Sequence, residues 1–409
     1  GNAKAFAGSN VDGAKVQYRV VREVRFPWLP WWYRRYLPTG SSMEITNGVT
    51  QTDAEGQFKI DFQAIPDRSA DAEQKPEFSY TVYADVTDIT GETHSNSTSV
   101  RVGYVALDVS VNVQEEINQA TFDSLEIATK NLNGEFEAAQ GTIVIEKLKM
   151  PERTFIDRYW QQPDKQLLSQ DEFIEKFPHL AYADEDEMHN WAVEGTVLQT
   201  GFDTEKQPKL AADMLTAGAY ALTLQTEDRY GTPVELKRYF TVYNIDDQQI
   251  PTTDFAKIVV PETRHEPGEA AEVVVTSTEN DLHLLYEIER DGEIIKQEWT
   301  GVDKFTTLIK EVTEADRGNF HFHLSYVRAN RSQTPSYTIN VPWSNKDLTI
   351  EYGTFRDKLR PGQEEEWQIK ISGSKGEQVA AEMVATLYDA SLDQFTTHSW
   401  AGLNPYPYS

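Results

Sequence analysis

Residues 80–93 read YTVYADVTDITGET, a β-prone run that ends in a tight turn at Asp88 and Gly91. Two other stretches keep the same order: residues 220–232 read YALTLQTEDRYGT, and residues 320–331 read FHFHLSYVRANR. In each stretch the turn begins eight residues after the leading aromatic residue, and a second β-prone run follows the turn. A strand, a tight turn and a closing strand that recur in this way predict an array of similar domains. Such an array favours a scaffold or a binding surface over an enzyme with a single pocket.

Pro-Gly pairs precede two further β-prone runs. EPGE at residues 266–269 comes before VVV at residues 273–275, and RPGQ at residues 360–363 comes before WQIKI at residues 367–371. Pro fixes φ and Gly permits a positive φ, so each pair predicts a turn that leads into a strand. Many short strands separated by turns indicate tandem antiparallel sandwiches.

The predicted strands fall into four groups, and 409 residues are too many for one sandwich core. We predict an all-β fold of tandem antiparallel β-sandwich, Ig-like domains. They are residues 1–103 with a Trp-rich insertion, 104–244 with a helical insertion at about 150–191, 245–343, and a partial, truncated sandwich at 344–409. The strands expected are Ala14–Val21, Phe58–Phe62, Phe78–Val86, Ser97–Val102, Val105–Val113, Ser124–Thr129, Gly141–Lys147, Trp191–Thr200, Tyr220–Glu227, Lys257–Val260, Glu272–Ser277, His283–Glu289, Thr307–Lys310, Asn319–Val327, Tyr337–Val341, Leu348–Thr354, Glu366–Ser372 and Glu382–Tyr388.

The insertion in the second region carries a helix start. Ser169 and Glu172 form a capping box, in which the Ser side chain accepts from the N3 amide and the Glu side chain reaches back to the N-cap amide. Phe173 and Phe177 give the helix an apolar face, and Pro178 ends it. We expect this short helix to pack on the sandwich edge.

The composition excludes several classes of function. The formal net charge is −28 and the excess is spread along the chain, which argues against binding to nucleic acid or anionic lipid. The chain has no Cys, so disulfides, thiolate metal sites and a Cys nucleophile are excluded for these residues. No apolar run approaches the roughly 20 residues that span a bilayer, so we expect no direct membrane insertion by this segment.

The chain lacks the motifs of common enzyme classes, and we predict no catalytic, cofactor-binding or metal-binding residues. His321 and His323 point to one side of a predicted strand, with His283 on a neighbouring strand, so a shared metal ion is one interpretation. The favoured alternative is a solvated sheet face, with Phe322 and Leu324 pointing inward. Residues 184–187, DEDE, are likewise interpreted as a solvated acidic loop in preference to a calcium site.

The densest aromatic cluster lies between residues 26 and 37. One interpretation is a surface for a partner protein or a sugar ring, because amphipathic aromatic residues with Arg dominate binding hot spots. The favoured interpretation is an insertion that packs against its own sandwich or the adjoining domain, since so many exposed aromatic residues would favour aggregation. The candidate partner-binding residues are Trp28, Trp31, Trp32, Tyr33, Arg34, Arg35 and Tyr36.

Three stretches resemble macroglobulin (MG) domains of the alpha-2-macroglobulin family. They are GSNVDGAKVQYRV at residues 8–20, DVTDITGET at residues 85–93, and LRPG at residues 359–362 followed by VAAE at 379–382 and YDASL at 388–392. The Trp-rich stretch and the insertion with Phe177, Pro178 and Trp191 are similar to the Bacteroides-type bacterial members. The resemblance covers most of the chain.

The resemblance implies a scaffold segment of a bacterial, broad-spectrum protease inhibitor that is not an enzyme and traps proteases after cleavage of a bait segment. The implied partners are neighbouring MG domains of the same chain and, transiently, a target protease. The bait is expected near or after Leu392, and any thioester domain after Ser409 in a longer protein. The implied location is exported, either periplasmic or on the outer cell surface, with an anchor elsewhere in that protein. The alternative is a surface adhesin or a carbohydrate-binding array of Ig-like domains.

Overall fold

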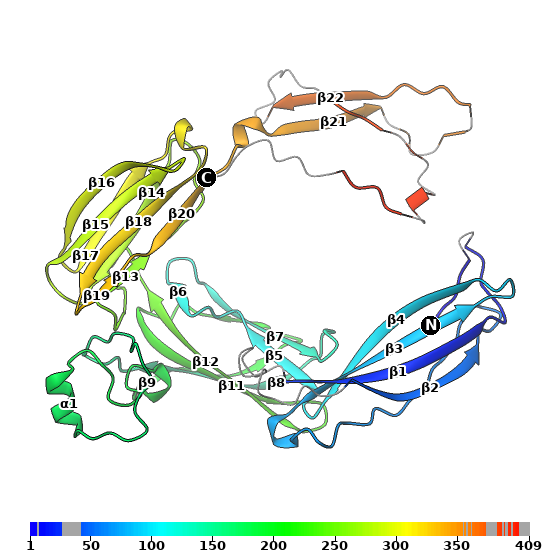
Figure 1. Ribbon diagram of the computed structural model, residues 1–409, viewed down its shortest axis with the longest axis horizontal. Helices are drawn as coiled ribbons and strands as arrows, with labels where there is room; N and C mark the ends of the chain where they lie inside the picture. Colours follow the sequence, from blue (N-terminus) through cyan, green and yellow to red (C-terminus); the bar gives the residue numbers. More distant parts are fainter. Residues whose placement is uncertain are drawn as a thin grey trace. The chain divides into compact units, whose positions relative to one another are not determined.

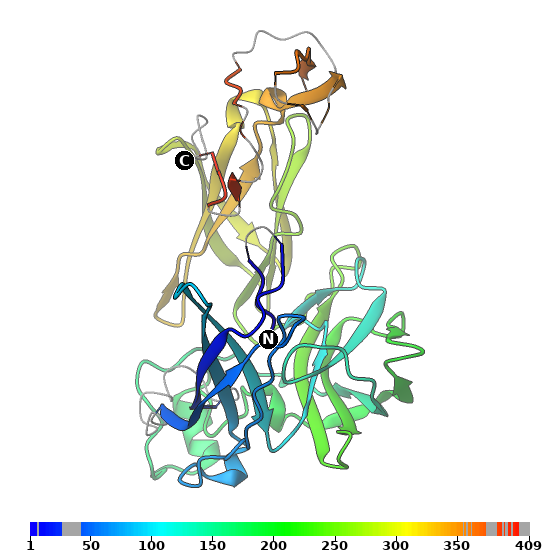
Figure 2. The same cartoon turned by 90° about the vertical axis from the view of Figure 1, so that its right-hand side faces the viewer.

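The computed structural model describes residues 1–5, 8–26, 42–354, 356, 359–360, 362–373, 383–386, 388, 392–393 and 396–400. The chain divides into two compact units. The first contains Gly1–Met150 and Glu187–Asn244, and the second contains Pro151–Asp186 and Ile245–Ser409. The described residues form mainly antiparallel sheets with one α-helix (Figures 1 and 2), so the prediction of an all-β fold of tandem sandwiches is confirmed.

The first region is a four-stranded antiparallel sheet in the order β2-β1-β3-β4. Its elements are β1 (Lys15–Arg25), β2 (Met43–Gln51), η2 (Ala72–Gln74), β3 (Glu77–Thr87) and β4 (Thr93–Gly103). The prediction of a strand at Phe58–Phe62 is wrong, because this segment makes no ladder with a neighbouring strand. Its apolar side chains, including Ile60 and Phe62, instead cover the buried face of the sheet around Tyr80. An extended chain can thus supply a second layer through packing alone.

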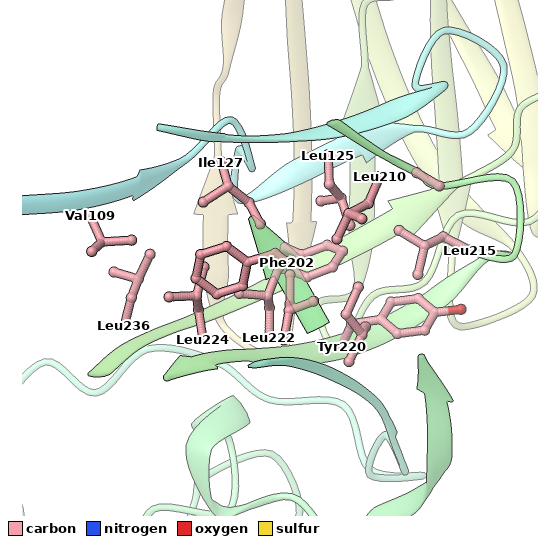
Figure 3. Close-up of a cluster of buried hydrophobic side chains, with 14 of the residues drawn as sticks. Val109, Leu125, Ile127, Phe202, Leu210, Leu215, Tyr220, Leu222, Leu224 and Leu236 are labelled. Carbon is pink, nitrogen blue, oxygen red and sulfur yellow. The ribbon is translucent and has the colours of Figure 1, made fainter. Parts of the chain in front are cut away.

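The second region is a sandwich of a three-stranded sheet, β10-β7-β5, and a five-stranded sheet, β6-β12-β11-β8-β9. Figure 3 shows its core, in which Ile127 and Leu125 of the smaller sheet face Leu222 and Leu224 of the larger one. The strands alternate buried and exposed residues, and this alternation directs their apolar side chains into that core. The elements are β5 (Leu107–Val111), β6 (Glu116–Asn118), β7 (Ser124–Asn131), β8 (Gln140–Leu148), η3 (Met188–Asn190), β9 (Val193–Asp203), β10 (Lys209–Ala211), β11 (Gly218–Glu227) and β12 (Pro233–Tyr243).

The third region is a sandwich of sheet β13-β14-β17 against a sheet in which β16, β15, β18 and β20 are neighbours and β19 closes a hairpin on β18. Phe320, Phe322 and Leu324 are fully buried in its core, and Phe322 and Leu324 were predicted to point inward from their spacing on the strand. The elements are β13 (Ala256–Val259), β14 (Ala270–Ser277), β15 (Leu282–Arg290), β16 (Glu293–Val302), β17 (Phe305–Glu311), η4 (Glu314–Asp316), β18 (Gly318–Arg328), β19 (Arg331–Gln333), β20 (Ser336–Val341) and η5 (Ser344–Lys346).

The fourth region contributes β21 (Leu348–Thr354) and β22 (Gln368–Gly373), which pair with each other. The predicted third strand, Glu382–Tyr388, is wrong for its described residues, 383–386 and 388, which are in no strand. β-structure requires a hydrogen-bonded neighbour, and β21 and β22 are the only paired strands among the described residues of this region.

Two of the three recurring turns, those at Asp88 and Asp228, share one backbone geometry. Asp88 accepts hydrogen bonds from the amides of Thr90 and Glu92 through its side chain, and its own amide donates to the carbonyl of Glu92. Asp228 makes the same bonds with Tyr230 and Thr232. The Gly at the fourth position has a positive φ in both turns, as this three-residue hairpin loop requires. The Asp and the Gly of the sequence repeat are therefore determined by turn geometry.

The helix of the insertion is α1 (Gln170–Lys176), and both hydrogen bonds of the predicted capping box are present. Figure 1 draws α1 and its loops in green. The chain leaves the second sandwich after β8 and returns at β9, but residues 151–186 belong to the same compact unit as the third sandwich. The sandwich on which the insertion packs is therefore the third one.

Candidate functional site

The predicted partner-binding residues Trp28, Trp31, Trp32, Tyr33, Arg34, Arg35 and Tyr36 lie outside the described residues. They remain a prediction.

The His pair on β18 lies on a solvated sheet face. The imidazole rings of His321 and His323 stack with their centroids 5.9 Å apart. His321 Nδ1 lies 3.0 Å from Thr338 Oγ1, and His323 Nε2 lies 2.7 Å from Glu289 Oε2. Across the described residues there is no group of three or more His, Cys, Asp or Glu side chains arranged to hold a metal ion.

The acidic loop at residues 184–187 is closed by its own Glu185. The amides of Tyr182 and Ala183 donate to the two carboxylate oxygens of Glu185 at 3.0 and 2.7 Å. Burial would raise the pKa of Glu185, but these backbone amides and Arg153 outweigh it and lower that pKa. The carboxylate therefore stabilises the loop in its ionised form.

A cavity with a volume of about 640 Å³ lies within the second compact unit. One wall is the first part of the insertion, residues 155–159, which we call the arm. The other walls come from the start of β13, the β18–β19 turn and the loop before β20. The lining residues are Phe155, Ile156, Asp157, Tyr159, Asp254, Phe255, Ala256, Lys257, Ile258, Tyr326, Arg328, Arg331, Ser332, Gln333, Thr334, Pro335 and Tyr337.

The arm is held against the third sandwich by backbone and ring contacts. The amide of Phe155 donates to the carbonyl of Thr253 at 2.8 Å, and the amide of Ile156 donates to the carbonyl of His179 at 2.9 Å. The ring of His179 packs edge-on against Phe255, and Ile156 packs against the core of the sandwich. These contacts fix the position of one wall of the cavity.

The charged side chains of the cavity differ in their partners. Arg328 forms an ion pair with Glu279. The guanidinium of Arg331 lies 3.7 Å from the ring centroid of Tyr159, and its Nη1 donates to the carbonyl of Asn330 at 3.3 Å. No carboxylate among the described residues forms an ion pair with Arg331. Burial, together with the charge of Asp254, raises the pKa of the Tyr326 phenol, which therefore stays neutral and can donate a hydrogen bond.

Sequence reasoning missed this cavity. Tyr159, Asp254 and Arg331 come from three distant segments, and no local pattern joins them. The spacing of the third repeat did place a turn at Arg328. The one usable signal was therefore a charged turn, with Arg328 and Arg331 where the other two repeats have Asp and Gly.

Comparison with known families identifies one segment. Residues 256–392 match the model of the alpha-2-macroglobulin bait region domain. The match begins at β13, so it includes the third sandwich and the fourth region as far as Leu392. It supports the alpha-2-macroglobulin resemblance that the sequence motifs indicated. No curated protein matches the sequence.

Three solved structures of bacterial alpha-2-macroglobulins are similar over most of the chain. The native E. coli protein has 12% identity and a TM-score of 0.29, with 91% of this chain and 24% of that chain covered. The trypsin-activated E. coli protein has 12% identity and a TM-score of 0.35, with the same coverage of 91% and 24%. The Salmonella protein reacted with methylamine has 13% identity and a TM-score of 0.28, with coverage of 90% and 23%. The chain spans about a quarter of the length of these structures.

In the part of the chain that the structure describes, no helix has both the length and the apolar character that a membrane span needs.

Proposed function

We propose that this chain is a scaffold segment of a bacterial, broad-spectrum protease inhibitor of the alpha-2-macroglobulin type. The observation that carries this proposal is the match of residues 256–392 to the bait region domain. The architecture is consistent with it, because rigid sandwiches joined in series can transmit a cleavage event at one segment to neighbouring domains. The chain itself is proposed to be a framework without enzymatic activity.

The proposed partners are the neighbouring MG domains of the same protein and, transiently, a protease. We propose cleavage by the protease as the trigger, because residues 256–392 match a bait region domain. The end of the matched segment is a suitable place for it. Val384, Leu392 and Trp400 have exposed side chains, and apolar residues of this kind suit elastase- and chymotrypsin-like proteases.

The four-domain division and the location complete the proposal. We retain domains at residues 1–103, 104–244, 245–343 and 344–409, with the insertion docked outside its own sandwich. We propose an exported protein of the periplasm or the outer cell surface, of Bacteroides type, anchored by another part of the protein. The Trp28–Tyr36 segment is its proposed partner-binding surface.

The test uses the full-length protein that carries this chain, incubated with trypsin, chymotrypsin or elastase. Trapping predicts three results: cleavage concentrated near or after Leu392, a smaller radius of gyration in small-angle scattering, and retention of the protease on gel filtration. A retained protease should still hydrolyse a small chromogenic peptide but lose activity on a large protein substrate. Trypsin inactivated at its catalytic Ser is the matched control, because it can bind but cannot cut.

Scattered cleavage between sandwiches, without compaction and without retained protease, would contradict trapping. That result would favour the alternative of an adhesin or a carbohydrate-binding array. For the Trp28–Tyr36 segment, we expect acrylamide to quench the Trp fluorescence strongly in the free protein. A bound partner should reduce this quenching. Weak quenching in the free protein would instead show that these aromatic residues pack internally.

A further inference from the structure

The edge of β13 that faces away from β14 is open. The amide of Thr278 donates to the carbonyl of Phe255, and the antiparallel register then directs the backbone groups of Lys257 and Val259 toward β14. The backbone groups of Ala256 and Ile258 consequently face the other side. Among the described residues, none forms a hydrogen bond with them there. An open edge of this kind is a template for another extended chain.

The arm begins to occupy this edge and then leaves it. Phe155 donates to the carbonyl of Thr253, just before β13, but the next amide, that of Ile156, bonds to His179 instead. Asp157 and Tyr159 then line the cavity, as do Ala256 and Ile258 of β13. The open edge of β13 therefore lines the cavity. The ligand whose backbone matches alternating amide and carbonyl groups on a strand edge is an extended polypeptide.

Arg331 offers a positive charge to such a polypeptide, in a cavity that Asp157 and Asp254 also line. Its guanidinium is fixed by the ring of Tyr159 and by the carbonyl of Asn330, and its Nε atom is buried without a hydrogen-bond partner. A guanidinium held in this way has donors left to bind a carboxylate in a forked geometry. The general field of the protein repels an acidic peptide, so any preference for one must arise locally.

We infer that this cavity binds an acidic segment of extended polypeptide, which adds a strand to the open edge of β13 and places a carboxylate on Arg331. Side chains on one face of a strand are two residues apart, so a segment with Glu at alternate positions presents its carboxylates to one wall. This inference rests on the third sandwich and the arm, and it does not depend on protease trapping.

Fluorescence polarisation with two labelled heptapeptides tests the inference on the full 409-residue chain. The first is Thr-Val-Glu-Val-Glu-Val-Thr with blocked ends, and the second has Lys in place of Glu. We expect the Glu peptide to bind in preference to the Lys peptide. Arg331→Gln should weaken Glu-peptide binding at least about tenfold, because a charge-assisted hydrogen bond is lost, and Arg331→Lys should restore part of the affinity.

Arg238→Gln is the matched control. Arg238 also donates from Nη1 to the carbonyl of the preceding residue, at 3.1 Å, but lies on β12 outside the cavity. Its loss should leave binding unchanged. Circular dichroism melting of all the variants separates loss of binding from loss of folding.

Two further measurements test strand pairing directly. A peptide that adds a strand to β13 donates only the amides on one of its edges. One edge carries the Val amides and the other carries the Glu and Thr amides. We therefore expect that N-methylation of one of these two sets abolishes binding and that N-methylation of the other set is tolerated. Hydrogen exchange of residues 255–260 should slow when the Glu peptide binds.

Equal binding by Arg331→Gln and the wild type, or preference for the Lys peptide, would overturn the role of Arg331. Tolerance of both methylated peptides, or unchanged exchange at residues 255–260, would overturn strand addition. If the free chain forms a dimer and Arg331→Gln abolishes that dimer, a second copy of the chain occupies the cavity. That result would likewise overturn the inference.

Discussion

The imidazole of His179 packs edge-on against the ring of Phe255, with the two centroids 4.8 Å apart. His179 belongs to the insertion between two strands of the second sandwich, whereas Phe255 precedes the first strand of the third. Thr154 Oγ1 also donates to Thr278 Oγ1 at 3.1 Å, which adds a side-chain bond from the insertion to the end of β14. The insertion is therefore a structural part of the third sandwich, although the chain reaches it from the second.

Replacement of His179 by Ala should release the arm. The ring supplies an aromatic contact, and its Nδ1 lies 3.2 Å from the carbonyl of Thr154. We expect faster hydrogen exchange at residues 153–159, and a loss of about 1 kcal/mol or less in the unfolding free energy of the sandwich. His189→Ala is the control, because its ring contacts Tyr239 in the other unit. Unchanged exchange at residues 153–159 in His179→Ala would show that backbone bonds alone hold the arm.

Replacement of Ser169 by Ala should destabilise α1. The Ser169 side chain accepts from the amide of Glu172, and the Glu172 carboxylate accepts from the amide of Ser169 at 3.1 Å. Loss of an N-cap costs roughly 1 kcal/mol, which should appear as about fivefold faster exchange in residues 170–176. Ser97→Ala, on the exposed strand β4, is the control. If both variants exchange alike in α1, the capping box does not determine the helix.

Sequence reasoning succeeded where the signal was local. The capping box at Ser169 was readable because its two partners are three residues apart. Tyr80, Tyr220 and Phe320 were readable as equivalent positions, and all three are fully buried. β16 was missed because it is an edge strand in which both faces are exposed, so it shows no alternation.

The errors and omissions have non-local causes. Phe58, Ile60 and Phe62 alternate like a strand, but alternation reports which side is buried and not whether a neighbour provides hydrogen bonds. The cavity depends on Arg331 meeting Tyr159, and that contact exists only because the insertion docks on the third sandwich. Sequence patterns describe single elements, whereas a site of this kind is defined by packing between them.

Replacement of Asp316 by Asn should destabilise the third sandwich substantially. The Asp316 carboxylate is fully buried, and it lies 2.7 Å from Lys310 Nζ and 3.2 Å from Arg290 Nη1. The Asn variant keeps the shape but removes the carboxylate that pairs with Lys310, and leaves Arg290 with only the longer 3.9 Å pair to Asp291. The expected cost is about 3 kcal/mol. Chemical denaturation, together with hydrogen exchange of β17 and β18, measures it. Asp61→Asn, which removes an exposed ion pair with Lys59, should cost less than about 1 kcal/mol.

The same carboxylate predicts a dependence on acid. Burial would raise the pKa of Asp316, but Lys310 and the hydroxyl and amide of Thr313 outweigh it and lower that pKa below the usual 3.8. A carboxyl group whose pKa is lower in the folded protein than in the unfolded chain stabilises the fold at any pH above its pKa in the unfolded chain. This contribution is lost as the pH falls through its pKa in the folded protein. The wild type should therefore lose stability more steeply than Asp316→Asn as the pH is lowered below 3.8. Parallel curves for the two proteins would contradict this.

Replacement of Gly141 by Ala should disrupt the sheet of the second sandwich. A Cβ atom at Gly141 would lie 2.1 Å from the backbone oxygen of Gln225 and 2.8 Å from a ring carbon of Phe202. Neither neighbour can move freely, because Gln225 lies in the paired strand β11 and Phe202 lies in the core. Overpacking of this kind costs about 1–3 kcal/mol, and the backbone clash places Gly141→Ala at the upper end of that range.

Gly201→Ala provides a matched control on the adjacent strand. A Cβ atom there would meet only the backbone oxygen of Gly141, at an ordinary 3.6 Å. We expect a change of less than about 0.5 kcal/mol, or a slight stabilisation because Ala restricts the unfolded chain. Urea denaturation and hydrogen exchange of β8 and β11 should separate the two variants clearly. Equal destabilisation would mean that glycine is needed on these strands for backbone flexibility, and that the close approach of β11 to Gly141 is not the cause.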